Sequence, residues 1–326
     1  MSLSRRGLFK GALLAGAGGV LAACGDKAAA KPPAWHDGRL FIATGNTTGV
    51  YYQIGGGLAD LIRRYVPGYD AHAESSGASG ENIKRVATGD FDLGFSNGDT
   101  AADAVAGKPP FAGQPQKIMA LTRLYRNYVH CVVRTAAGIN TFADLRGKRI
   151  STSSLNSGSD VVAGRILTAG NLDPDKDVIR QRLSLPETTK GMQAGTTDAL
   201  FFTGGLPTPG ITDLFASGPG LYRFLPLEAQ LPALTAKFGS VYGVAALSAT
   251  TYHTPADTPT IVLFNMLIVS PNMPDGLAYD ITKVLYEHQQ ELAKVHPEGG
   301  HFDKASGPNT DPVPLHPGAR RYFNGD

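Results

Sequence analysis

Short polar turns, rich in hydroxyls, amides and glycine, recur where an apolar run of the sequence gives way to a helix-like pattern. The turns read "TGNTTG" (44–49), "SSGASGEN" (75–82), "SNGDT" (96–100) and "LNSGSD" (155–160). The first amides of a helix are unpaired and carry partial positive charge, so together with hydroxyls they suit a carboxylate. One such turn is more often a helix cap than a site. The repetition favours a binding site for a small anion.

Other chemistries find little support in the sequence. The turns lack the spacing of a phosphate loop or a dinucleotide fingerprint, and the signatures Gly-x-Ser-x-Gly and His-Glu-x-x-His are missing. The histidines have no metal-ligand spacing, and "DPDKD" (173–177) lacks the glycine and closing glutamate of a calcium loop. We therefore expect no catalytic residue, no metal and no cofactor. A formal net charge of +2 without a basic run argues against a nucleic-acid partner.

The elements that must position these turns alternate between strand and helix patterns. "LFIAT" (40–44) predicts a strand and residues 51–65 predict a helix, and the alternation continues along the chain. This is typical of an α/β fold with mixed sheets flanked by helices, in which ligands bind beyond the carboxyl ends of strands. "KIMALTRLYRNYVHCVVRT" (117–135) predicts one long extended segment that leaves one lobe and enters another, as a hinge requires.

The N-terminus has the pattern of an export signal. "SRRGLFK" precedes the apolar run "GALLAGAGGVLAAC", which is too short to span a bilayer. We predict a signal peptide over 1–23, lipidation at Cys24 and a tether over 24–38. Arg5-Arg6 fits a twin-arginine signal, and a generic secretory n-region stays open. Such a chain would be periplasmic and held at a membrane. Cys131, in an apolar run, is expected to be a buried small hydrophobe.

Six segments occur in the order expected of a known family. They read "TGNTTGVYYQIGGGLADL", "SSGASGENIKRVATGDFDLGFSNGD", "NSGSDVVAGRIL", "DALFFTGGLPTP", "YDITKVLYEHQQEL" and "LHPGARRYF". Over Leu40 to Phe323 the chain resembles the TAXI family, the solute-binding proteins of TRAP-type transporters. The resemblance implies two lobes with a ligand cleft between them, and a membrane transporter subunit that receives the solute. The lobes would be residues 39–126 plus roughly 255–326, and residues 127–254. We expect a monomer that binds a small organic anion or an amino acid, such as glutamate or a dicarboxylate.

The resemblance also implies which residues contact the ligand. They are Thr47, Tyr51, Tyr52, Ser75, Ser76, Ser79, Asn82, Asn97, Asp99, Ser157, Gly158, Ser159 and Pro207. Tyr51 and Tyr52 are alternatives at the first turn, and Asp99 and Asp160 also fit simple pairing with a helix N-terminus. The sequence departs from the family at Asn97, where glutamine is frequent, and at Arg126, where proline is frequent. Arg126 is either an anion ligand or a solvated hinge charge. A sensor for a signalling receptor and an enzyme on a similar fold remain alternative functions.

Overall fold

The computed structural model describes residues 35–326. The predicted signal peptide, the lipidation site Cys24 and most of the tether lie outside these residues. The end of the predicted tether belongs to the fold, because Trp35–Gly38 forms a short 3-10 turn and the Trp35 amide donates to Tyr69 Oη at 3.1 Å. Within the described part of the chain, no helix is long and apolar enough to cross a membrane.

The first lobe combines the N-terminal and C-terminal parts of the described chain. Its elements are β1 (Arg39–Ala43), α1 (Val50–Tyr65), β2 (Asp70–Glu74), α2 (Ser79–Thr88), β3 (Leu93–Asn97), α3 (Gly98–Ala106), α9 (Asp275–Glu287), α10 (Gln289–Val295), η6 (Pro297–Gly300) and α11 (Pro317–Asn324). In α1 the apolar residues Val50, Ile54 and Leu58 recur at four-residue spacing, and each is at most 2% exposed. Burial of this stripe fixes the start of α1 beside the first polar turn.

The second lobe repeats the theme of strands followed by helices. Its elements are η3 (Thr135–Ala137), η4 (Phe142–Leu145), β5 (Arg149–Ser151), α4 (Gly158–Ala169), β6 (Ile179–Gln181), α5 (Leu185–Ala194), β7 (Ala199–Gly204), α6 (Pro209–Ser217), β8 (Tyr222–Phe224), η5 (Glu228–Gln230), α7 (Leu231–Phe238), β9 (Gly243–Leu247) and α8 (Ala249–Tyr252). Ser157 and Ser184 accept hydrogen bonds as N-caps of α4 and α5, which explains where these helices begin.

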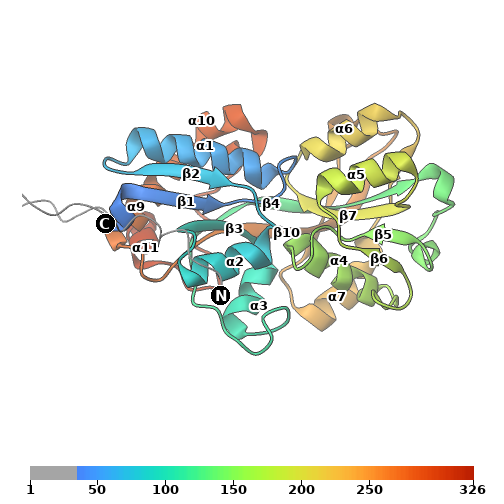
Figure 1. Ribbon diagram of the computed structural model, residues 1–326, viewed down its shortest axis with the longest axis horizontal. Helices are drawn as coiled ribbons and strands as arrows, with labels where there is room; N and C mark the ends of the chain where they lie inside the picture. Colours follow the sequence, from blue (N-terminus) through green and yellow to red (C-terminus); the bar gives the residue numbers. More distant parts are fainter. Residues whose placement is uncertain (1–34) are drawn as a thin grey trace, which may run out of the picture.

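Two long strands, β4 (Met119–Arg134) and β10 (Thr258–Val269), run through both lobes and pair antiparallel. The sheet order is β2-β1-β3-β10-β4-β7-β5-β6, with β8 paired to β4 and β9 paired to β10. Neighbours are parallel among β1, β2 and β3, and again among β5, β6 and β7. Figure 1 shows the lobes side by side, joined by β4 and β10, with helices on both faces of the sheet. The predicted α/β fold with a mixed sheet flanked by helices is confirmed.

The hydrophobic core is divided between the lobes. Two clusters take their buried members from residues 40–125 and 266–319, and two others from residues 129–263. The division therefore falls inside β4 and β10 themselves. The lobe boundaries inferred from the sequence stay predictions. Cys131 lies in β4 with no exposed surface, as expected, and burial raises the pKa of its thiol.

Candidate ligand-binding cleft

A small cavity lies between the lobes, at the ends of β1, β3 and β7 and at the N-termini of α1, α2 and α4. We call it the cleft cavity. It is lined by Gly45, Asn46, Gly49, Val50, Tyr51, Ala78, Ser79, Asn97, Tyr125, Asn127, Ser153, Ser157, Gly158, Ser159, Phe202, Thr203 and Gly204. All of these side chains are uncharged at neutral pH. An anion bound here would therefore depend on helix amides, hydroxyls and side-chain amides rather than on an arginine or lysine.

The first-lobe wall is a network of three asparagines and a tyrosine. Tyr51 Oη donates to Asn97 Oδ1 at 3.0 Å, and Asn127 Nδ2 donates to the same oxygen at 2.8 Å. Asn265 Oδ1 accepts from Asn127 Nδ2 and shares the Tyr51 hydroxyl hydrogen with Asn97 Oδ1. Burial raises the pKa of Tyr51, so its hydroxyl stays protonated and acts as a donor. The network joins α1, β3, β4 and β10 at the point where the long strands pass between the lobes.

Two polar atoms of this wall have no partner within the described chain. Tyr125 Oη and Asn127 Oδ1 are buried without a hydrogen bond to any of residues 35–326. Leaving a buried donor or acceptor unpaired costs about 1–3 kcal/mol, so such atoms need an explanation. Both residues line the cleft cavity, and one offers a donor while the other offers an acceptor. A solute with both an acceptor and a donor would satisfy them.

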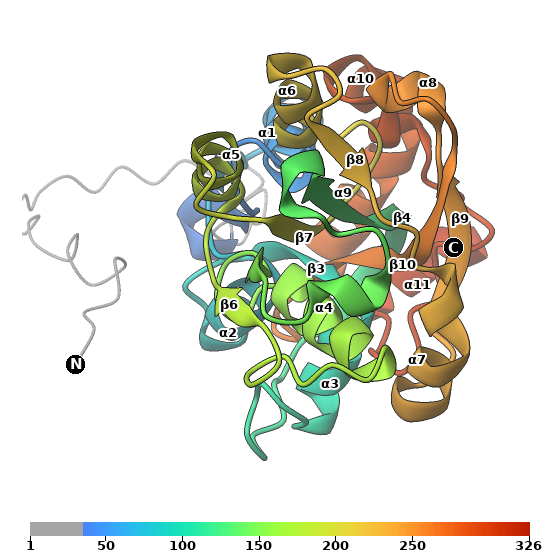
Figure 2. The ribbon, with the colours of Figure 1, turned by 90° about the vertical axis from the view of Figure 1, so that its right-hand side faces the viewer.

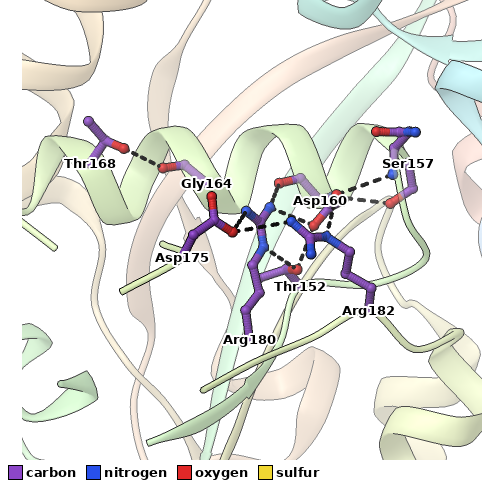
Figure 3. Close-up of polar contacts among 9 residues, drawn as sticks. Thr152, Ser157, Asp160, Gly164, Thr168, Asp175, Arg180 and Arg182 are labelled. Carbon is purple, nitrogen blue, oxygen red and sulfur yellow. Dashed lines mark hydrogen bonds and ion pairs between the residues drawn. The ribbon is translucent and has the colours of Figure 1, made fainter. Parts of the chain in front are cut away.

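The second-lobe wall is the start of α4, which is held rigidly. Ser157 Oγ accepts from the Asp160 amide at 3.1 Å. Asp160 in turn accepts from Thr152 Oγ1 and from Arg180 Nη2, each at 2.6 Å, and Figure 3 shows these contacts with Arg182 beside them. Asp160 is therefore committed to anchoring the helix. Ser159 Oγ lies 2.9 Å from Thr203 Oγ1, which ties α4 to the end of β7.

The two lobes touch across the cleft. A Cβ on Gly158 would lie 2.5 Å from Asn97 Nδ2, and a Cβ on Gly80 would lie 2.3 Å from the Asn156 carbonyl oxygen, so each glycine permits close approach of the opposite lobe. Asn97 Nδ2 also donates to Thr203 Oγ1 at 3.3 Å. The cavity left between them is about 30 Å³, room for about two water molecules. A solute of several heavy atoms therefore requires the lobes to separate.

A charged cluster beside the cleft also joins the lobes. Arg165 of α4 lies 3.0 Å from Asp99 Oδ2 of α3 and also pairs with Asp103, while Tyr242 Oη donates to Asp99 at 2.7 Å. We call Asp99, Asp103, Arg165 and Tyr242 the interlobe clasp. Asp99 and Asp103 are 3% and 8% exposed. Burial raises the pKa of Asp103 although Arg165 opposes the shift.

The structure brings together some of the residues predicted to contact the ligand. Those that line the cleft cavity are Tyr51, Ser79, Asn97, Ser157, Gly158 and Ser159. Thr47, Tyr52, Ser75, Ser76, Asn82, Asp99 and Pro207 do not line it. The contacts of the first group with a solute stay predictions.

The residues of the second group have other partners or face solvent. Asn82 Nδ2 donates to the carbonyls of Thr44 at 2.7 Å and Phe95 at 2.8 Å, and its Oδ1 accepts from Ser76 Oγ at 2.5 Å. The hydrogen bonds of Asn82 thus link the end of β1 to β3. Pro207 offers its carbonyl to His296 Nε2 at 2.8 Å. Asp99 belongs to the interlobe clasp, Thr47 and Ser75 are exposed, and Tyr52 is 39% exposed.

Sequence reasoning missed Tyr125, Asn127, Thr203 and Asn265. Asn265 belongs to the hydrogen-bond network of the first-lobe wall, and Tyr125, Asn127 and Thr203 line the cleft cavity. Asn127 and Asn265 sit inside long apolar strands, where a buried amide needs partners. An asparagine within an apolar strand was therefore the signal in the sequence. Only the pairing of β4 with β10 shows that Asn127 and Asn265 meet.

The two-lobed α/β fold with a cleft between its lobes is shared with solved structures of binding proteins. Similar solved structures are the alkanesulfonate-binding protein SsuA from Xanthomonas axonopodis bound to MOPS (TM-score 0.53, 15% identity, 88% of this chain and 83% of that chain) and MatC from Rhodopseudomonas palustris with bound malate (TM-score 0.55, 12% identity, 80% and 89%). A third is a binding protein component of an ABC phosphonate transporter from Pseudomonas aeruginosa (TM-score 0.52, 12% identity, 80% and 78%). At these identities the likeness shows the fold.

The sequence model of the NMT1-like family matches residues 42–325, so the chain belongs to the NMT1-like family. The match covers nearly all of the described residues, including every residue that lines the cleft cavity.

Proposed function

We propose that this protein is an extracytoplasmic solute-binding protein that captures a small carboxylate-bearing solute in the cleft cavity. The observation that carries the proposal is the convergence of three helix N-termini, those of α1, α2 and α4, on a cavity between two lobes. Lobe closure follows from a population shift, because contacts from both walls form only when the lobes meet. MatC, a structure of the same fold, holds malate, which is itself a carboxylate.

The unpaired atoms favour an amino acid, such as glutamate, over a simple dicarboxylate. Tyr125 Oη can donate to a carboxylate, and Asn127 Oδ1 can accept from an ammonium group. A dicarboxylate at neutral pH offers acceptors only, and would leave Asn127 Oδ1 unpaired.

The experiment is to identify what co-purifies with the protein by mass spectrometry and then to titrate amino acids and dicarboxylates by calorimetry. We expect tight binding of one amino acid. At a hundredfold excess over Kd, that amino acid should raise the free energy of unfolding by about 2.7 kcal/mol, and the melting temperature should rise accordingly. Failure of every carboxylate in the panel to bind would overturn the proposal.

We also propose that the solute passes to a TRAP-type membrane transporter and that lipid on Cys24 holds the protein at the membrane. The motifs that resemble the TAXI family support this partner. The P. aeruginosa binding protein of similar fold serves an ABC transporter, which makes an ABC-type partner the second candidate. Uptake in cells depleted of ATP but given an imposed ion gradient separates the two, because only an ion-coupled transporter works under those conditions. Fractionation of a Cys24→Ala variant tests the anchor: a variant that stays in the membrane pellet would contradict it.

A further inference from the structure

A second, larger cavity lies outside the cleft, where β10 changes its strand partner. Along one edge, β10 pairs with β9 through Thr258–Val262 and with β3 through Asn265–Val269. Leu263 and Phe264 lie between these pairings, at the passage from one lobe to the other. Figure 2 shows β9 running beside β10 in this region. The cavity has a volume of about 410 Å³, and we call it the seam cavity. This volume lies within the range of about 300–1,000 Å³ that ligand sites occupy.

The seam cavity contains two arginines that form no ion pair within the described part of the chain. Arg123 and Arg126 both lie on β4 and both line the cavity. Neither forms an ion pair with any carboxylate of residues 35–326. Asp99 and Asp311 also line the cavity, but Asp99 is engaged by the interlobe clasp and Asp311 is exposed.

Both guanidinium groups make cation–π contacts with the ring of Phe264. The Arg123 guanidinium carbon lies 3.1 Å from the centroid of the Phe264 ring, and that of Arg126 lies 5.6 Å from it. Arg123 Nε is buried and has no hydrogen-bond partner among residues 35–326. Burial first, and the positive charge of Arg126 second, lower the pKa of Arg123. Two close cations with an unused buried donor are costly unless an anion joins them.

We propose that the seam cavity binds a small oxyanion, a carboxylate or a phosphate group carried on a compact apolar body, through Arg123 and Arg126. Guanidinium groups match the oxygens of carboxylate and phosphate in a fork-like geometry. Phe264, Val241 and Val244 supply an apolar wall for the rest of the ligand, and the two valines are 42% and 45% exposed. This site is separate from the cleft cavity, because no residue lines both.

Calorimetric titration at low ionic strength tests the proposal, with benzoate, phenyl phosphate and inorganic phosphate as probes. We expect saturable binding of benzoate or phenyl phosphate, and weaker binding of inorganic phosphate, which lacks the apolar body. The preferred probe of the first two shows which oxyanion the site takes. Arg126→Met and Arg123→Met should each weaken binding by about tenfold or more, since each removes a charge-assisted hydrogen-bond donor. Arg126 is exposed, so its replacement keeps the proposal testable even if Arg123→Met fails to fold.

Two further variants serve as controls. Arg39→Met removes an exposed arginine at the start of β1 and should leave probe binding unchanged. β1 lies two strands from β10, and the register places its start at the Val269 end of β10, away from Phe264. Tyr125→Phe alters the cleft cavity and should likewise leave the probes unaffected while weakening the cleft solute. The proposal is overturned if no probe binds saturably, or if both arginine variants bind with wild-type affinity. Equal loss of probe binding in Tyr125→Phe would place the probe in the cleft and also overturn it.

Discussion

Replacing Arg165 by methionine is expected to open the lobes rather than to unfold them. Asp99 and Asp103 are 3% and 8% exposed in the closed arrangement. Without the guanidinium, Asp99 keeps hydrogen bonds from Thr100 and from the Tyr242 hydroxyl, whereas the Asp103 carboxylate loses its ion-pair partner. Breaking a buried pair by removing one partner costs about 3–5 kcal/mol. If the lobes separate, α3 and α4 part and water solvates both carboxylates. The cost therefore falls on the closed form and reduces its population relative to the open form by about two to four orders of magnitude.

Small-angle X-ray scattering and denaturant unfolding measure the two sides of this prediction. We expect a larger radius of gyration for Arg165→Met. The free energy of unfolding should fall by no more than the free-energy difference between the closed and open forms, because opening the lobes relieves the rest of the cost. Arg180→Met is the matched control, because Arg180 pairs with Asp160 within the second lobe (Figure 3). That variant should lose stability without any change in the radius of gyration. An Arg165→Met protein with unchanged dimensions and a stability loss as large as that of Arg180→Met would refute the reasoning.

Three further variants test the site and its surroundings. Asn82→Ala should lower the free energy of unfolding by about 1–3 kcal/mol, because buried carbonyls lose their donor, while calorimetry shows solute affinity unchanged; the opposite outcome would return Asn82 to the ligand site. Tyr125→Phe should leave stability unchanged and weaken solute binding by about tenfold, and unaltered affinity would contradict the role given to its hydroxyl. Burial lowers the pKa of His130 from its ordinary value of 6.5 to about 4, so the fold holds it neutral. Its contribution to the free energy of unfolding is present above pH 6.5 and falls by on the order of 3 kcal/mol as the pH drops toward 4. Denaturant unfolding of His130→Gln across this pH range should lack that fall.

The polar turns were readable from the sequence because strand-to-helix connections bring local residues to one edge of a sheet. The resemblance to the TAXI family then singled out Tyr51, Ser79, Asn97 and Ser157 within these turns, and all four line the cleft cavity. Asn82 belongs to such a turn as well. Its amide turns back to the carbonyls of neighbouring strands, and a side chain that ties a fold together has the same residue type and spacing as one that binds a ligand.

Long-range partners were beyond sequence patterns. Asp99 meets Arg165 across the lobes, and 66 positions separate them in the chain. Asn127 and Asn265 meet because β4 and β10 pair antiparallel, with Asn127 opposite Leu263 in the register. Alternation of strands and helices predicts the layers of an α/β fold, but it leaves open which long strands become neighbours and how they are aligned.

The placement of charge separates the control of lobe closure from the control of selectivity among solutes. The cleft cavity has only uncharged side chains, whereas the ion pairs that hold the lobes together belong to the interlobe clasp. The apparent Kd of a solute equals its intrinsic Kd divided by the fraction of protein in the binding-competent form. A change in the clasp should therefore scale the affinities of all solutes by one factor, while a change in the cleft wall alters their ratio. Asp99 and Tyr242 belong to the clasp and also line the seam cavity, which places the proposed oxyanion site beside the contacts that favour the closed form.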